Sequence, residues 1–414
     1  MSGVWPWTAW LTAAGDGFAW PPAGWHHPLV FVVLFCALVD FVKMLIELLG
    51  RNAERQFTSD PAAVTAVIPC KDGAGELPGT LSDLLRVLPA GNVLVVDDGS
   101  RDETSAVASG FGVRVHRFER SKGKAAAIHW AVHRVTTPLT LLLDDDTRLG
   151  GARIPTSLVT EDGYDAVAFH VLPDRRDRAG AHGNHFMGWL QRYEYGKSME
   201  IGKRFHDQSL SVACVSGAIG LFRTSDLDAF HHEHTGVFPG EDLQRTLILL
   251  LHGRRVVFAN EPVWTVAPSH VGHWLRQRLW GWYPGLYHEL ANFIRLLFRS
   301  GVAWRLRYEM MYNLYTTVSD PLKTWSIVLF AITPGLRWWA LAMYLTYLAF
   351  EIHPWWVIRL PGSRRRAPLS VLLFYPVYGA INTLLRTLAV LSWAWSRGVT
   401  GTMRPRRGPG DRIA

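Results

Sequence analysis

The sequence has few cysteines, few charged residues and, over its first 27 positions, no lysine or arginine. Three cysteines in 414 residues, Cys36, Cys70 and Cys214, exclude a scaffold built on disulfides. Charged residues make up 19% of the chain and hydrophobic residues 49%, which excludes disorder as the main state. The apolar stretch 28–49 lacks both a basic segment before it and a small-residue cleavage site after it, so it is not a typical signal peptide.

Tryptophan and charge are unevenly distributed along the chain. Of the 19 tryptophans, only Trp130 and Trp189 lie within 61–250. Residues 1–250 hold 23 basic and 29 acidic side chains, whereas residues 251–414 hold 20 basic and 6 acidic ones. Trp favours the membrane–water interface, and basic residues beside apolar segments favour anionic headgroups. The net charge of +8 therefore indicates a lipid bilayer as partner, and no nucleic acid.

The first 270 residues divide into two parts. Residues 1–58 contain a predicted transmembrane helix at about 28–49, which is long enough for one span. Asp40, Lys43 and Glu47 interrupt it, and we expect them to face other helices or headgroups. Arg51 and Arg55 follow, which by the positive-inside rule places the next part in the cytosol. That part, 59–270, alternates short apolar runs (65–69, 92–97, 113–118, 139–144) with helical spacing (77–88, 124–135). This alternation predicts a doubly wound α/β domain with buried parallel strands.

The remaining residues predict membrane helices. Residues 271–305 have the composition of interfacial amphipathic helices. Within 306–396, the segments 310–332 and 336–358 predict a hairpin broken at Thr333-Pro334-Gly335, and 369–396 is a last apolar stretch. The linker 359–366 and the basic tail 397–414 both favour the cytosol. Either 369–396 crosses once against that rule, or it bends back as a re-entrant pair. We expect a multi-pass protein of the plasma membrane, or the bacterial inner membrane.

Acidic clusters follow the predicted strands. Asp72 ends the first strand, Asp97-Asp98-Gly99-Ser100 follows the second, Asp144-Asp145-Asp146 follows 139–143, and Gly240-Glu241-Asp242 opens a helical stretch. Open α/β sheets bind ligands outside the carboxyl ends of their strands. Two carboxylates at i and i+2 suit a divalent cation shared with substrate phosphates. The alternative, a solvated turn, is disfavoured for three adjacent carboxylates because they repel one another.

Five motifs in order carry a family resemblance: VVDDGS (95–100), GKAAAI (123–128), DDDT (144–147), SGAIGLFR (216–223) and GED (240–242). Together they resemble family 2 glycosyltransferases, and more closely the membrane-integrated branch that includes hyaluronan, chitin and cellulose synthases. The resemblance implies a GT-A (Rossmann-like) catalytic fold, a UDP-sugar donor, inversion at the anomeric carbon, and Mg²⁺ or Mn²⁺ as cofactor.

The resemblance also implies roles for residues of these motifs. Nucleotide binding falls to Asp72, Asp98, Lys124, Asp144 and Asp145, metal binding to Asp144 and Asp146, catalysis to Asp242 as general base with Glu241 beside it, and the acceptor side to Gly217. Inversion needs one in-line attack, so one carboxylate must take the proton of the acceptor hydroxyl. Other interpretations remain open: Asp98 as a helix cap, Lys124 as a surface lysine, and Asp242 as an acid supporting the helix dipole.

The next motif departs from the family pattern. Membrane synthases carry Gln-x-x-Arg-Trp, whereas here Gln277 is followed by Trp280 and Gly281 at the Arg and Trp positions. Trp282 would then stack on the sugar and Arg278 would pair with the diphosphate, or both anchor the segment at the interface. The departure weakens the case for processive synthesis.

We expect polymerisation of a β-linked polysaccharide on a glycan acceptor. The alternatives are single transfer to a lipid or polyprenyl-phosphate acceptor and an inactive membrane scaffold. A homo-oligomer is compatible with each.

His231-His232-Glu233-His234 precedes the GED motif. Adjacent histidines in a loop point in different directions, and no matching Cys or Asp set stands near them in the sequence. We interpret this run as a polar loop beside the site rather than as a metal site.

Overall fold

The computed structural model describes residues 27–48, 54–174, 185–235, 240–268, 270–358 and 366–400. Arg51, the linker over 359–365 and the basic tail beyond residue 400 lie outside the described residues. The side of the membrane on which each segment lies therefore stays a prediction.

A seven-stranded sheet forms the core of the α/β half, in the order β3-β2-β1-β4-β6-β5-β7. The strands are β1 (Val64–Cys70), β2 (Val93–Asp97), β3 (Arg114–Arg117), β4 (Leu139–Leu143), β5 (Ala166–Pro173), β6 (Ile219–Arg223) and β7 (Val256–Thr265). The predicted α/β fold is confirmed. One detail differs, because β6 runs antiparallel to both β4 and β5. Ile219, the first residue of β6, pairs with Leu143, the last of β4, so β6 starts at the edge where β4 ends.

Helices cover the sheet because its central strands are apolar on both faces. Every residue of β1, β2, β4 and β5 is buried. The covering helices are α3 (Leu77–Leu84), α4 (Thr104–Gly110), α5 (Lys124–Val132), α6 (Thr156–Thr160), α9 (Thr224–Phe230) and α10 (Glu241–Leu251). α5 packs on β1 and β2, so its first residue, Lys124, stands at the edge where these strands end. Helices α3 and α5 end three or four residues earlier than the expected ranges 77–88 and 124–135.

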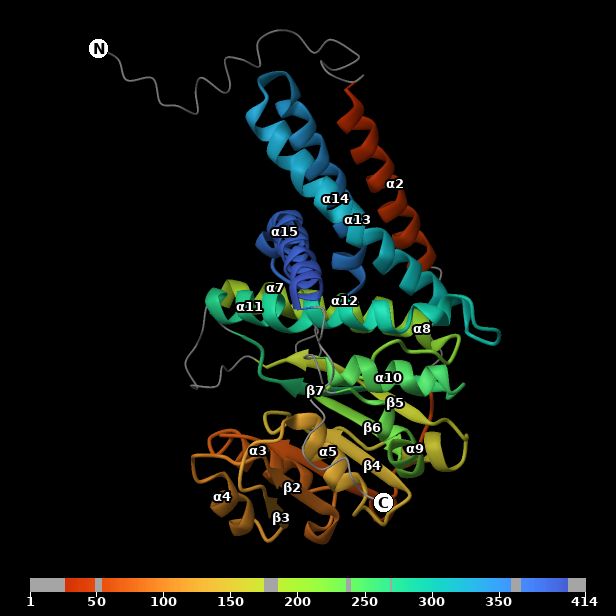
Figure 1. Cartoon of the computed structure of the whole chain (residues 1–414), viewed down its shortest axis with the longest axis vertical. Helices are drawn as coiled ribbons and strands as arrows, with labels where there is room; N and C mark the ends of the chain where they lie inside the picture. Colours follow the sequence, from red (N-terminus) through yellow and green to blue (C-terminus); the bar gives the residue numbers. More distant parts are fainter. Residues whose placement is uncertain are drawn as a thin grey trace, which may run out of the picture.

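A middle layer of short helices lies between the sheet and the long helices (Figure 1). It contains α7 (His185–Lys197), a π-helical turn (Ser198–Lys203), α8 (Arg204–Asp207), α11 (Val271–Gln277), a second π-helical turn (Arg278–Trp282) and α12 (Tyr283–Asn292). Leu290 of α12 belongs to the core of the sheet, whereas Trp274 of α11 packs with α15. The segment expected at an interface thus connects the two halves of the molecule.

The described residues also form four long helices: α2 (Pro28–Leu48), α13 (Trp304–Ile332), α14 (Arg337–Val357) and α15 (Leu369–Thr400). Figure 1 shows α2, α13 and α14 side by side, extending away from the sheet. Among the described residues, α2 and the Leu369–Ala394 part of α15 are long and apolar enough to cross a membrane. α13 and α14 pass that test only together, as a pair bent by 116° at the expected break. α15 continues through Pro376, so this stretch is one helix rather than a bent pair.

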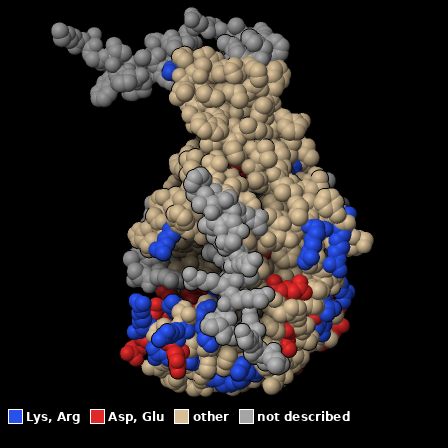
Figure 2. All heavy atoms as spheres, in the orientation of Figure 1, with Lys and Arg blue, Asp and Glu red and all other residues tan. Residues whose placement is uncertain are grey.

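The long helices are apolar outside and carry charges inside. Figure 2 shows almost no charged side chains on the visible face of that part of the molecule. Asp40 of α2 accepts hydrogen bonds from the Tyr312 hydroxyl (2.8 Å) and the Tyr347 hydroxyl (2.7 Å), and pairs with Lys323 (2.9 Å). The expectation that Asp40 faces other helices is confirmed. Such an arrangement suits a bilayer, where an isolated charge is costly.

Candidate active site

The predicted motifs meet where β1, β2 and β4 end. The chain continues from β1 to β2 on one side of β1, while β4 pairs with β1 on the other side. This reversal of strand order is the topological switch point, where open α/β sheets bind their ligands. Asp72 follows β1, Asp98 follows β2 and Asp144 follows β4, so the fold brings three of the predicted acidic clusters to one edge.

Asp98 organises the loop that leads into α5. Its carboxylate accepts hydrogen bonds from the Ser121 hydroxyl (2.7 Å), the Lys122 N–H (2.6 Å) and the Gly123 N–H (3.0 Å). Gly123 has a φ of 93°, a conformation that favours glycine. Asp98 therefore fixes the backbone immediately before Lys124. It does not cap the helix after its own strand, and a direct contact with the nucleotide stays a prediction.

Asp72 joins the end of β1 to the loop after β2. Its N–H donates to the Ser100 hydroxyl (2.9 Å), and its Oδ1 accepts a hydrogen bond from the Arg101 N–H (2.7 Å). Asp72 is exposed and has a φ of 53°, which an aspartate tolerates better than most residues. The two loops that would flank a nucleotide base are thus tied together at this residue.

Lys124 joins two of the motifs. Its Nζ lies 2.5 Å from Asp144 Oδ1 and 2.8 Å from Glu241 Oε1. Burial, with the negative charge of Asp146 nearby, raises the pKa of Asp144 to about 6. Burial alone would also raise the pKa of Glu241, but the Lys124 ammonium lowers it to about 2. Lys124 is therefore no free surface lysine: it holds together the DDD and GED motifs, which are almost a hundred residues apart.

The other two aspartates of the DDD motif lie on different sides. Asp146 is 5% exposed, and its Oδ1 accepts a hydrogen bond from the Thr265 hydroxyl at the end of β7 (3.2 Å). Asp145 turns toward β1, with its Oδ2 3.3 Å from Cys70 Sγ. Asp144 and Asp146 offer hard oxygen donors, and the charge of Asp146 adds to the effect of burial on the pKa of Asp144. This donor set fits a divalent cation such as Mg²⁺ or Mn²⁺.

Asp242 lies at the start of α10 and is held by two backbone groups. Its Oδ2 accepts a hydrogen bond from the Gly217 N–H and its Oδ1 one from the Leu243 N–H, both at 2.8 Å. A Cβ at Gly217 would lie 3.3 Å from Lys124 Nζ and 3.4 Å from Asp242 Oδ2. Gly217 thus lets three motifs approach one another closely. Gly240, which precedes α10, has a φ of 118°, and only glycine adopts this readily.

The segment 277–282 contacts Glu194 and Tyr195 of α7. Arg278 is 2% exposed, with its Nη2 2.5 Å from Glu194 Oε2 and its guanidinium 3.9 Å from the ring centre of Trp282. Trp280 is 68% exposed, and Gln277 Oε1 is buried without a hydrogen-bond partner among the described residues. Tyr195 lies 5.8 Å from Trp282, ring to ring. Burial raises the pKa of Tyr195, and the negative charges of Glu194, Asp146 and Asp242 add to this effect. The structure therefore brings Arg278 to Glu194 rather than to the acidic cluster. Its expected role at the diphosphate stays a prediction.

Two further residues of the site are not predicted from the sequence. Cys214 Sγ lies 3.9 Å from Asp242 Oδ2. Lys203 is 9% exposed, its Nζ has no hydrogen-bond partner among the described residues, and burial lowers its pKa. Both line a cavity of about 800 Å³ that also touches Asp40, Tyr347 and other residues of all four long helices. No sequence motif marks either residue, because only the fold places them beside Asp242.

Comparisons with known proteins identify the family of the chain. The sequence model of the glycosyltransferase-like family 2 matches residues 61–283, more than half of the chain. The chain belongs to this family and has the GT-A fold.

An uncharacterized glycosyltransferase of Mycobacterium tuberculosis is 37% identical over 121 residues, which are 29% of this chain and 52% of that protein. A succinoglycan biosynthesis protein of Rhizobium meliloti is 33% identical over 129 residues, 30% of this chain and 37% of that protein. The chain thus spans about half or less of the length of these curated relatives.

Among solved structures, a mannosyltransferase of Pyrobaculum calidifontis, in complex with GDP-mannose and Mn²⁺, has a TM-score of 0.59 and 14% identity. The match covers 89% of this chain and 97% of that one. At this identity the likeness concerns the fold, which includes the long helices as well as the sheet.

Proposed function

We propose that the protein transfers a sugar from a UDP-sugar, with inversion, onto an acceptor that reaches the site from the membrane. One observation carries this proposal: the cavity that extends between the long helices is lined by Cys214, whose Sγ lies 3.9 Å from Asp242 Oδ2. Asp40 from α2 and Tyr347 from α14 line the same cavity. An acceptor held there would present its hydroxyl group to Asp242 from the membrane side.

The residues of the site supply the steps of an in-line displacement. The acceptor oxygen attacks the anomeric carbon, the bond from that carbon to the diphosphate breaks, and UDP leaves with the electron pair. The acceptor proton passes to the Asp242 carboxylate. The N–H groups of Gly217 and Leu243 orient this carboxylate without occupying all of its lone pairs.

Asp144 and Asp146 would hold Mg²⁺ or Mn²⁺ at the donor side. Bound there, the cation would neutralise the charge that develops on the leaving diphosphate. Lys124 already pairs with Asp144, which fixes one of the two carboxylates in the absence of donor. Asp72 and Asp98 frame the edge where the nucleotide would lie.

Lys203 favours one of the two acceptor classes. A buried ammonium without a partner is unfavourable, and a bound phosphate would relieve this cost. Lys203 faces the cavity and lies near enough to Asp242 for their charges to interact. The second candidate function, single transfer to a hydroxyl group of a lipid that carries a phosphate, is therefore better supported by the geometry than polysaccharide polymerisation.

Product analysis tests the proposal and separates the two classes. The full chain in membranes is incubated with radiolabelled UDP-Glc, UDP-GlcNAc, UDP-Gal or UDP-GlcA. One product soluble in organic solvent indicates a lipid acceptor, whereas a ladder of sizes indicates a polymer. Lys203→Met should lower lipid labelling by at least about tenfold, and Lys203→Arg, which keeps the charge, should retain more of it. No transfer from any of these donors would contradict the proposed donor class.

A further inference from the structure

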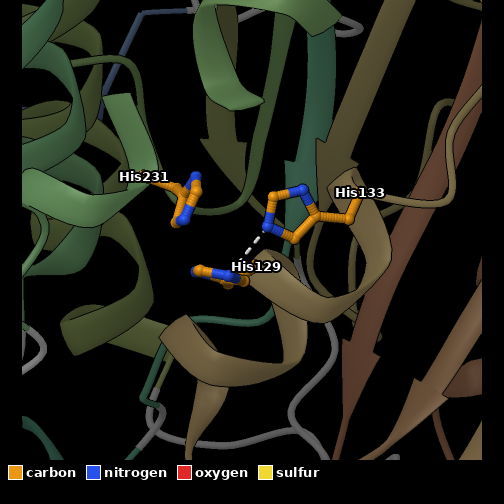
Figure 3. A group of neighbouring side chains, drawn as sticks. All are labelled: His129, His133 and His231. Carbon is orange, nitrogen blue, oxygen red and sulfur yellow. Dashed lines mark hydrogen bonds between the residues drawn. The ribbon is translucent and has the colours of Figure 1, made fainter. Parts of the chain in front are cut away.

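Three histidines from distant parts of the sequence converge between α5 and the segment that follows α9. His129 is on α5, His133 is the residue that ends α5, and His231 begins the 3-10 turn His231–Glu233 after α9. Their imidazole rings lie close together (Figure 3). The ring centres of His129 and His231 are 3.7 Å apart, and those of His133 and His231 are 4.6 Å apart. Each ring offers one nitrogen, and these three nitrogens all lie within 4.8 Å of one another.

Asp228 orients two of the three rings. Its carboxylate pairs with His133 Nδ1, and its backbone carbonyl accepts a hydrogen bond from His231 Nδ1. In both rings the proton is thereby placed on Nδ1, which leaves Nε2 as an acceptor; Nε2 of His133 accepts a hydrogen bond from His129 Nε2. Histidines that bind metals are held in the same way, by a carboxylate or carbonyl on the nitrogen that does not bind.

The third ring completes the set. His129 Nε2 lies 3.0 Å from His133 Nε2, across one turn of helix. Two histidines at i and i+4 on one helix face are a common basis for a zinc site. Burial, with the positive charge that His231 and His133 would carry, lowers the pKa of His129 to about 4. His129 is therefore neutral near neutral pH, and a neutral imidazole is the form that binds metals.

We propose that His129, His133 and His231 form a binding site for Zn²⁺ or a similar borderline transition-metal ion. Zn–N bonds are about 2.0–2.1 Å long, so tetrahedral ligands lie about 3.3–3.5 Å apart. The observed separations, from 3.0 Å to at most 4.8 Å, bracket this value and need only small side-chain movements. Nitrogen donors distinguish the site from Asp144 and Asp146, whose oxygens suit Mg²⁺ or Mn²⁺. Three protein ligands leave a fourth position for water.

The site connects two segments that lead to the catalytic residues. α5 begins with Lys124, and the chain continues from the 3-10 turn to the GED motif. A bound ion would fasten the end of α5 to the segment that follows α9. The expected effect is a more stable contact between α5 and this segment. The sequence does predict a polar run at 231–234, but His129 and His133 come from a segment about a hundred residues earlier, which is why the run alone gives no ligand set.

Metal binding by the full chain in detergent, without a polyhistidine tag, tests the proposal. After dialysis against a chelator, Zn²⁺ is titrated calorimetrically with Mg²⁺ present in excess, and Co²⁺ is added to a second sample for its visible absorption. We expect one tight Zn²⁺ per chain and a tetrahedral Co²⁺ spectrum. His231→Gln and His129→Gln should each weaken binding by at least about tenfold, and Asp228→Asn by about 10- to 100-fold.

Two control variants separate this site from others on the chain. His232→Gln changes the exposed neighbour of His231 in the same turn and should bind Zn²⁺ as the unchanged chain does. Asp146→Asn alters the oxygen site and should also leave Zn²⁺ binding intact. The proposal is overturned if the chain shows no tight Zn²⁺ site, or if His232→Gln reduces binding as much as His231→Gln. Circular dichroism and gel filtration confirm that each variant is folded.

Discussion

Replacing Asp242 by asparagine isolates the proton-accepting role of this residue. Asparagine has nearly the same shape as aspartate but cannot take up the acceptor proton. Loss of a general base typically slows turnover by about 100- to 10,000-fold. This range corresponds to a barrier higher by about 3 to 5 kcal/mol. Asp144, Lys124 and the donor edge remain unchanged in Asp242→Asn, so we expect UDP to bind as tightly as it does to the unchanged chain.

The same exchange has a structural cost that must be separated from catalysis. Asp242 accepts one backbone N–H on each carboxylate oxygen, from Gly217 and from Leu243. Asparagine offers only one oxygen, so one N–H would face the NH₂ group and lose its partner. An unsatisfied group of this kind costs about 1–3 kcal/mol when buried, and this half-buried site should lie at the lower end.

Asp102→Asn is the matched control. Its carboxylate likewise accepts two backbone N–H groups, from Ala74 (3.0 Å) and Thr104 (3.1 Å), away from the proposed reacting atoms. We expect similar losses of melting temperature in the two variants, but a large loss of turnover only in Asp242→Asn. Transfer of radiolabel and calorimetric UDP binding are measured on both. Turnover by Asp242→Asn close to that of Asp102→Asn would refute the assignment of Asp242 as base.

Three other changes probe the site and its support. Gly217→Val places a side chain against Lys124 and Asp242. This exchange should lower the rate constant of transfer by about 100-fold while UDP binding changes less. Equal losses of transfer and of UDP binding would show that the site has collapsed. Asp98→Asn removes one of three hydrogen bonds to the loop 121–123. The KM for the sugar donor should therefore rise by about tenfold or more. An unchanged KM would show that this loop does not shape the donor site. Burial raises the pKa of Glu289 to about 7, so its contribution to stability is full below pH 4.5 and is lost as the pH rises through 7. Glu289→Gln should therefore remove up to about 3 kcal/mol of this pH-dependent change in unfolding free energy, and a melting profile with the same slope as the unchanged chain would contradict it.

Much of the catalytic half is predictable because its signals are local. The runs 65–69, 92–97 and 139–144 are continuous and apolar, as strands buried on both faces must be, and each is a strand within one or two residues. The carboxyl ends of parallel strands share one edge, so the positions of Asp72, Asp98 and Asp144 follow from the strand order alone. The direction of β6 does not follow, since a five-residue apolar run reads the same in both directions.

The remaining features depend on contacts between distant segments, which no single stretch of sequence records. Lys203 looks like any exposed lysine until the long helices close over it. The histidine cluster needs two segments about a hundred residues apart, and each alone resembles a polar surface. Spacing within one segment predicts which side chains share a face. This spacing does not predict which residues of other segments pack against that face.

The connection between the membrane helices and the active site is of this second kind. The Trp274 N–H donates to the Tyr378 hydroxyl (3.1 Å), which donates to Glu194 (2.8 Å), the partner of Arg278. Three elements of the middle layer are thereby joined to α15. Because Arg278 stacks on Trp282 and Trp282 contacts Tyr195, a shift of α15 would reach Tyr195, whose ring is within the electrostatic influence of Asp146 and Asp242. An acceptor that enters between the long helices would therefore contact the same elements that position the catalytic side chains. This arrangement explains why polar residues are concentrated inside the helical part rather than on its surface.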